Sequence, residues 1–108
     1  MGVDIHTSAI VDPKAEIGEN VVVDAFAMVG PHASIGDNCR IFHHATVEGR
    51  VTLGSGNLIH SYSLIGGLTH DLKYQGGEPG LEIGDNNIFR EYVTAHVATE
   101  EDDVTVIG

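Results

Sequence analysis

The sequence predicts an all-β fold in the form of a solenoid with three flat walls. The first observation behind this prediction is a strict period of six residues. An aliphatic residue returns at every sixth position from Ile5 to Ile65. A period of six excludes an amphipathic helix, whose period is about 3.6 residues, and it is a multiple of the strand period of two. A short strand and a turn, repeated many times, indicate a solenoid. The eleven aliphatic residues are Ile5, Val11, Ile17, Val23, Val29, Ile35, Ile41, Val47, Leu53, Ile59 and Ile65.

A second, longer period predicts the shape of each coil. Gly-Glu-Asn at 18–20 and Gly-Asp-Asn at 36–38 start three repeats apart, and Gly-Asp-Asn-Asn at 84–87 starts eight repeats further on. All three segments therefore stand in the same phase of the repeat. Gly, Asn and Asp tolerate positive φ or bond their own backbone, so these segments are expected to be turns. Pro13 and Pro31 are also three repeats apart, and three repeats per coil predict a triangular prism.

The composition agrees with a thin, repeated interior. The 108 residues allow one domain, and they include no Trp, three Phe and three Tyr beside many small aliphatic residues. The net charge of −11 argues against nucleic acid or an anionic membrane as a partner. The single cysteine, Cys39, excludes an internal disulfide and stands where other repeats have Ala or Val, so we expect a small buried residue. No signal peptide or membrane span is visible, and a cytoplasmic protein without membrane insertion is expected.

The repeats fail at one place and then resume. Residues 67–82 hold four glycines and Pro79, which predicts a loop that leaves the prism. The repeats return at 83–88, 89–94 and 95–100, a second departure follows at 101–107, and Ile107 opens another repeat. No capping element covers the last coil, so residues 1–108 are expected to form a single but incomplete β-helix domain.

The tandem pattern of an aliphatic residue, Gly or Asp, two variable residues and a small residue resembles the hexapeptide-repeat family. That resemblance implies a left-handed parallel β-helix, whereas the general rule for parallel crossovers gives the right-handed form. The loop segments 70–74 (HDLKY) and 77–79 (GEP) resemble the loop of the bacterial UDP-N-acetylglucosamine O-acyltransferases. The segments 82–87 and 90–96 continue the match. The resemblance covers essentially the whole chain, which aligns with roughly the first two fifths of that family's chain.

The resemblance implies a reaction and an assembly. An (R)-3-hydroxyacyl group would pass from acyl carrier protein to the 3-hydroxyl of UDP-N-acetylglucosamine, the first step of lipid A biosynthesis, without a metal or a dissociable cofactor. A histidine would act as general base, which suits an imidazole with a pKa near neutrality. The family is a homotrimer with its active sites between neighbouring prisms. Its catalytic histidine lies in an Ala-His-x-x-His-Asp segment beyond Gly108, as do its remaining coils and helical domain, so residues 1–108 alone are expected to be inactive.

Four residues are carried over as candidate substrate-binding residues. Asp71 and Lys73 match loop positions that face the nucleotide sugar, where a carboxylate accepts hydrogen bonds from hydroxyls and an ammonium neutralises phosphate. His70 stands where the family has Gln, and His96 matches a histidine near the cleft. The alternatives are two solvated charges on a loop and two surface histidines. After His96 the family has Arg-Gly-Thr, whereas this chain has Val-Ala-Thr at 97–99.

Two other functions and one metal site remain as alternatives. The chain could be a non-catalytic β-helix module for trimerisation or binding, or an acyltransferase for another sugar. His60 and His96 lie two coils apart when each coil is counted as three repeats, a spacing that zinc-binding hexapeptide-repeat carbonic anhydrases use. Glu101 holds the place of the third histidine of that pattern, so no metal site is expected. His43 and His44 fall at turn positions and are expected on the surface.

Overall fold

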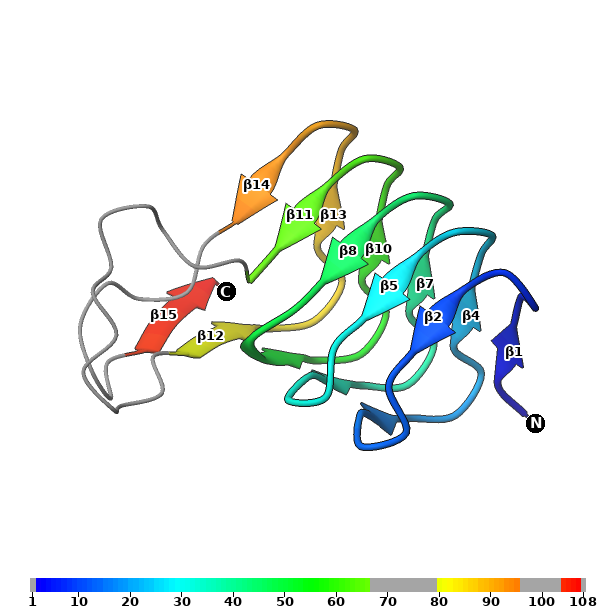
Figure 1. The fold of residues 1–108 in the computed structure, drawn as a ribbon. Helices are drawn as coiled ribbons and strands as arrows, with labels where there is room; N and C mark the ends of the chain where they lie inside the picture. The colour runs from blue at the N-terminus through cyan, green and yellow to red at the C-terminus, as the bar shows by residue number, and fades with distance from the viewer. Residues whose placement is uncertain (1, 67–79, 96–103, 108) are drawn as a thin grey trace.

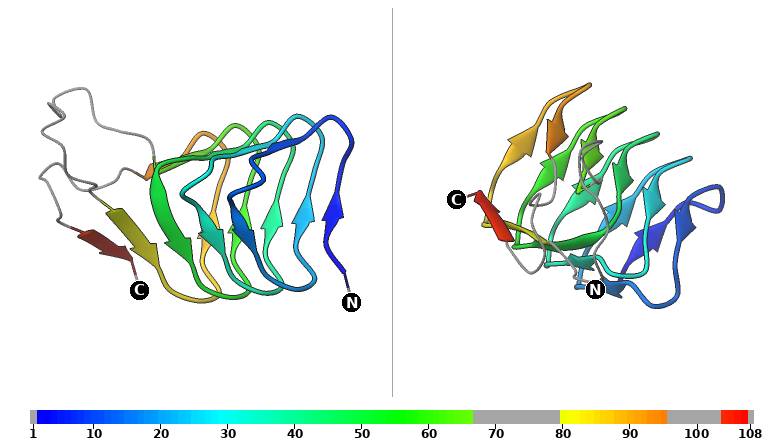
Figure 2. Two further views of the ribbon diagram at one scale, coloured as in Figure 1. Left: turned by 60° about the horizontal axis from the view of Figure 1, so that its bottom comes forward. Right: turned by 60° about the vertical axis from the view of Figure 1, so that its left-hand side comes forward.

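Short strands wind into three parallel sheets that form the three walls of a prism (Figures 1 and 2). The structure is a computed structural model and describes residues 2–66, 80–95 and 104–107. Sheet A contains β1 (Asp4–Ile5), β4 (Val22–Val23), β7 (Arg40–Ile41), β10 (Leu58–Ile59) and β13 (Ile88–Phe89). Sheet B contains β2 (Ile10–Val11), β5 (Met28–Val29), β8 (Thr46–Val47), β11 (Leu64–Ile65) and β14 (Thr94–Ala95). Sheet C contains β3 (Glu16–Ile17), β6 (Ser34–Ile35), β9 (Arg50–Leu53), β12 (Gly80–Ile83) and β15 (Val104–Ile107).

The predicted coil of three repeats is confirmed by the strand register. In sheet A, Val23 pairs with Ile41 and Ile41 pairs with Ile59, each three repeats further on. Ile59 then pairs with Phe89, five repeats further on, because the segment between β11 and β12 adds the length of two repeats to one coil. The strands that follow the loop therefore keep the same phase. The coils stack in chain order, and β1 and β15 lie at opposite ends of the stack (Figure 2).

The aliphatic series forms the core of the prism. The last residue of each strand points inward, and from Val23 to Phe89 these side chains are at most 8 % exposed. Ile5 belongs to the first coil and is 40 % exposed, because no described coil covers its outer side. Cys39 is buried as predicted, and burial raises the pKa of its thiol. No helix able to span a membrane occurs in the described part of the chain.

Asn57 is a fully buried polar residue at an inward position that Val21 and Cys39 hold in the preceding coils. Its Nδ2 donates to the carbonyl oxygens of Gly54 and Gly84 at 3.1 and 2.8 Å. Its Oδ1 accepts a hydrogen bond from the backbone N–H of Asn87 at 2.8 Å. A buried amide is tolerated here because its donors and its acceptor are satisfied by neighbouring turns.

The turns from sheet C to sheet A use the residues that the sequence predicts. Asn20, Asn38, Gly56 and Asn86 adopt positive φ angles between 58° and 71°. Asn and Gly adopt the left-handed conformation with the least strain. Corresponding turns therefore lie above one another in successive coils and keep the walls straight.

Gly36 lies where two such turns come closest, which gives a test of the coil spacing. A Cβ at Gly36 would lie 2.5 Å from the carbonyl oxygen of Gly54, and the Gly36 N–H donates across the coils to Leu53 O at 2.8 Å. We expect Gly36→Ala to reduce the free energy of unfolding in urea by about 1–3 kcal/mol, because backbone atoms must move apart. Gly2→Ala is the control, since nothing lies within 4 Å of its Cβ position. Equal stability of the two variants would contradict the close approach.

Candidate functional site

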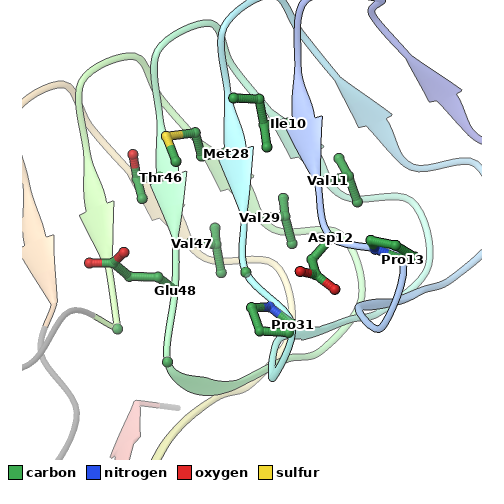
Figure 3. Close-up of a pocket in the computed structure, with 13 residues that line it drawn as sticks. Ile10, Val11, Asp12, Pro13, Met28, Val29, Pro31, Thr46, Val47 and Glu48 are labelled. Carbon is green, nitrogen blue, oxygen red and sulfur yellow. The ribbon is translucent and has the colours of Figure 1, made fainter.

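A groove of about 770 Å³ runs along the outer face of sheet B and the turns that lead from sheet B to sheet C (Figure 3). Ile10, Met28 and Thr46 point outward into it from three neighbouring strands, β2, β5 and β8. The carboxylates of Asp12 and Glu48 lie at its rim. Its volume falls within the range of small-molecule sites. The full lining is Ile10, Val11, Asp12, Pro13, Met28, Val29, Gly30, Pro31, Thr46, Val47, Glu48, Gly49 and Gly66.

The turns that line the groove follow from the sequence period. Pro13 and Pro31 are one coil apart and therefore occupy the same turn in successive coils. Proline fixes its φ angle and donates no backbone hydrogen bond, which suits a turn outside the sheet ladder. Asp12 Oδ1 accepts a hydrogen bond from Lys14 N at 2.9 Å and closes the first of these turns. Glycines at 30, 49 and 66 carry no side chain to fill the hollow.

Gly66 closes one end of the groove and is the last described residue before the loop. Its φ angle is +90°, and a Cβ there would overlap Val51 Cγ2 and the carbonyl oxygen of Glu48. Gly80 begins β12 after the loop, and a Cβ there would lie 3.0 Å from the guanidinium of Arg50. Gly66 and Gly80, the described residues on either side of 67–79, thus both lie against β9 and the turn before it.

The predicted substrate-binding residues lie outside the described residues. His70, Asp71 and Lys73 belong to 67–79, and His96 belongs to 96–103. Their contact with a substrate therefore stays a prediction. Glu101, the residue that argued against a zinc site, also falls in 96–103, whereas His60 is described and lies away from the groove, its ring stacked on Phe42 at 4.4 Å.

The side chains that line the described groove are mainly apolar, with two carboxylates at its rim. Among the residues that line it in the described ranges, the charged groups are carboxylates and none is a histidine, lysine or arginine. No group of three His, Cys, Asp or Glu side chains that could hold a metal occurs in the described ranges either. The apolar side chains of this wall can hold an apolar group or a neighbouring chain, and Asp12 and Glu48 supply its charged groups.

One feature of the described structure is absent from the sequence predictions. Phe26, His44, Tyr62 and Tyr92 form a continuous stack of rings, with centroid separations of 5.1, 5.0 and 5.5 Å. The sequence signal is the spacing of one coil from Phe26 to His44 and from His44 to Tyr62, followed by the longer step of the loop-bearing coil. His43 and His44 lie on the surface as predicted.

The family model for bacterial transferase hexapeptide repeats, described as six repeats, matches residues 14–49 and 32–67, which together span half of the chain. The chain belongs to the hexapeptide-repeat family. An acyl-[acyl-carrier-protein]–UDP-N-acetylglucosamine O-acyltransferase from Akkermansia muciniphila is 52 % identical over 105 residues, which are 97 % of this chain and 40 % of that relative. This chain thus spans about two fifths of the length of the curated relatives it matches.

Solved structures of hexapeptide-repeat proteins agree with the fold. The UDP-N-acetylglucosamine acyltransferase from Campylobacter jejuni superposes with a TM-score of 0.87 at 33 % identity and covers 97 % of this chain and 41 % of its own. LpxA from Acinetobacter baumannii gives a TM-score of 0.89 at 37 % identity, over 96 % of this chain and 41 % of its own. The predicted left-handed parallel β-helix and the resemblance to this acyltransferase family are confirmed.

The anchoring of the loop at Gly66 can be tested with two glycines of the same groove. Gly66→Ala is expected to reduce the free energy of unfolding by about 1–3 kcal/mol and to speed hydrogen exchange in β11 and β14, because both the positive φ and the overlap with Val51 oppose a side chain. Gly30→Ala is the matched control, since its Cβ would lie 3.5 Å from Glu48 Cα, an ordinary contact. Faster exchange in both variants, or in neither, would contradict a specific requirement at Gly66.

Proposed function

We propose that this chain is part of an O-acyltransferase that moves an (R)-3-hydroxyacyl group from acyl carrier protein to the 3-hydroxyl of UDP-N-acetylglucosamine, the first step of lipid A biosynthesis. The observation that carries the proposal is the 52 % identity, over 97 % of the chain, to a relative named for this reaction. The loop sequence HDLKY followed by GEP supports the same acceptor over another sugar. The reaction uses no metal or dissociable cofactor and takes place in the cytoplasm.

The substrate site is proposed to combine the loop with the wall of sheet B. Asp71 accepts hydrogen bonds from the sugar hydroxyls, Lys73 neutralises negative charge on the nucleotide sugar, and His70 and His96 flank the sugar. Gly66 and Gly80 support this arrangement, because the segment 67–79 starts and ends at residues that lie against β9 and the turn before it, and Gly66 also lines the groove. The general base is a histidine of a segment beyond residue 108.

The active protein is proposed to be a homotrimer. A flat, repetitive wall offers little concavity to a substrate, and a three-fold arrangement of prisms creates clefts between neighbouring chains. Residues 1–108 form one β-helix domain of this assembly, and the remaining coils and a helical domain complete the subunit.

Acyl transfer tests the reaction. The protein encoded by the whole open reading frame is expected to transfer a 3-hydroxyacyl group from acyl carrier protein to UDP-N-acetylglucosamine, measured by mass spectrometry of the nucleotide sugar. Residues 1–108 alone are expected to give no product above background, because they lack the general base. Absence of product from the whole protein would favour the second candidate, a non-catalytic β-helix module, which the exposed apolar side chains on sheets A and B also suit.

Substitutions in the loop test the proposed contacts. Lys73→Ala and Asp71→Asn in the whole protein are each expected to weaken binding of UDP-N-acetylglucosamine about 10- to 100-fold in titration calorimetry, because a charge-assisted hydrogen bond contributes about 1.5–3 kcal/mol. Lys14→Ala, on an exposed turn of the first coil, is the control for the loss of one positive charge. Equal affinities for Lys73→Ala and Lys14→Ala would show that Lys73 is only a solvated charge.

A further inference from the structure

The buried polar side chains of the prism belong to a single coil. In the described ranges, Asn57, Ser61 and Ser63 are the polar residues that are 9 % exposed or less. They lie between β9 and β11, in the last coil before the segment 67–79. In the two preceding coils, the positions that correspond to Asn57 and Ser63 are apolar. The residues there are Val21, Cys39, Ala27 and Ala45.

Two of these side chains form hydrogen bonds to the coil that follows the segment 67–79. Asn57 Nδ2 donates to Gly84 O at 2.8 Å, and Asn57 Oδ1 accepts a hydrogen bond from the Asn87 N–H at 2.8 Å. Ser63 Oγ donates to Arg90 O at 2.6 Å. The two coils are therefore joined inside the prism by side chains as well as by the strand ladders.

The six-residue period alone does not fix the strand register across this coil. Ile59 pairs with Phe89, but Ile83 and Ala95 stand one repeat before and one repeat after Phe89, and each of them also ends a strand. A shift of the register by one repeat would therefore still place an apolar residue opposite Ile59. The preceding coils contain three repeats and have no spare length for such a shift, whereas the coil between β10 and β13 contains five.

Asn57 distinguishes the observed register from a shifted one. The pairing of β10 with β13 places Asn57 opposite Asn87, whose N–H it binds. A shift by one repeat toward the C-terminus would place Asn57 opposite Val93, whose N–H already donates to Arg90 O at 3.3 Å within its own turn. The Asn57 side-chain oxygen would then lack its donor in a dry interior. A buried amide that loses a partner disfavours the state that contains it.

We infer that Asn57 and Ser63 form a register lock, which selects the strands that pair across the lengthened coil. A single buried asparagine fixes the register of otherwise apolar helix pairs in the same way, at a cost in stability. Val21 shows that the prism accepts an apolar residue at the position of Asn57 where the coil length leaves no choice. Because each later coil stacks on the one before it, the lock also sets the wall on which every later strand lies.

Cross-linking on the outer face of sheet C reports the register. Thr52 pairs with Glu82, whereas a shift by one repeat would bring Ile88 opposite Thr52. In the whole protein, with Cys39→Val and any cysteine beyond residue 108 replaced, Thr52→Cys is combined with Glu82→Cys or with Ile88→Cys. Each protein is refolded from urea and treated with a short thiol cross-linker, and products within one chain are measured by mass spectrometry. With the lock intact, positions 52 and 82 are expected to be linked and positions 52 and 88 are not.

Asn57→Val/Ser63→Ala separates register from stability, because it introduces the residues that stand at positions 21 and 45. We expect the ratio of the 52–82 product to the 52–88 product to fall at least about tenfold. The melting temperature is expected to stay unchanged or to rise, since apolar residues replace buried polar ones. Val51→Ala, which removes an apolar contact across the same coil, is the control and should lower the melting temperature without changing the ratio. An unchanged ratio in Asn57→Val/Ser63→Ala would overturn the inference, and so would failure of this variant to fold, because the pair would then serve stability.

Hydrogen exchange in the unchanged whole protein provides a second test. The Asn87 N–H donates to a side chain inside the prism, whereas the Leu58 and His60 N–H groups donate to backbone carbonyls of the next coil. If Asn57 holds the coil in register, the Asn87 amide is expected to exchange as slowly as these two ladder amides. Exchange of the Asn87 amide at the rate of an unprotected amide would overturn the inference, because the Asn57 contact would then not persist.

Discussion

The structure depends on one constraint, the parallel backbone pairing of each coil with the next at a fixed offset. Each short strand forms hydrogen bonds only to strands one coil before and one coil after, as in the register of Val23, Ile41 and Ile59. Every residue type at a given position is therefore stacked on the same position of its neighbours. Inward columns collect aliphatic side chains, turn columns collect Asn and Gly, and one turn column collects aromatic rings. The surface properties of a whole wall or edge follow from a single position in the repeat.

The loop is compatible with this constraint because it adds a whole number of repeats between two pairing strands. Leu53 pairs with Ile83 at the same wall position at which Ile35 pairs with Leu53. The four-residue strands β9 and β12 lengthen the pairing where the chain returns, and Gly66 and Gly80 allow the backbone and Arg50 to approach closely. The stacked coils therefore support the segment between β11 and β12, whose sequence need not follow the six-residue repeat and can instead be selected for ligand binding.

The sequence predicts the walls, the coil length and the buried Cys39, because these follow from periodicity alone. Periodicity does not predict the left-handed winding, because the general rule for parallel crossovers favours the right-handed form. Only the resemblance to the family predicts the left hand. Asn57 stands at the inward position that Val21 and Cys39 hold, but periodicity alone does not predict its hydrogen bonds to carbonyl groups of two different coils. The ring stack was missed for a related reason: Tyr92 joins Tyr62 only after the two added repeats are counted. The candidate substrate-binding residues rest on resemblance to the family motif alone, because they lie outside the described residues.

The sequence separation between paired strands is larger across the segment between β11 and β12, and this affects the entropy of forming that coil. Pairing across five repeats, as from Ile59 to Phe89, lengthens the segment that must be ordered before the next contacts form, compared with three repeats from Ile41 to Ile59. The entropy of loop closure grows only with the logarithm of length, so the difference is about 0.5 kcal/mol. A prism of this kind can thus accept an insertion at one corner with almost no loss of cooperativity between the coils on its two sides. New recognition sequences can therefore evolve at that corner with little loss of stability in the stacked coils.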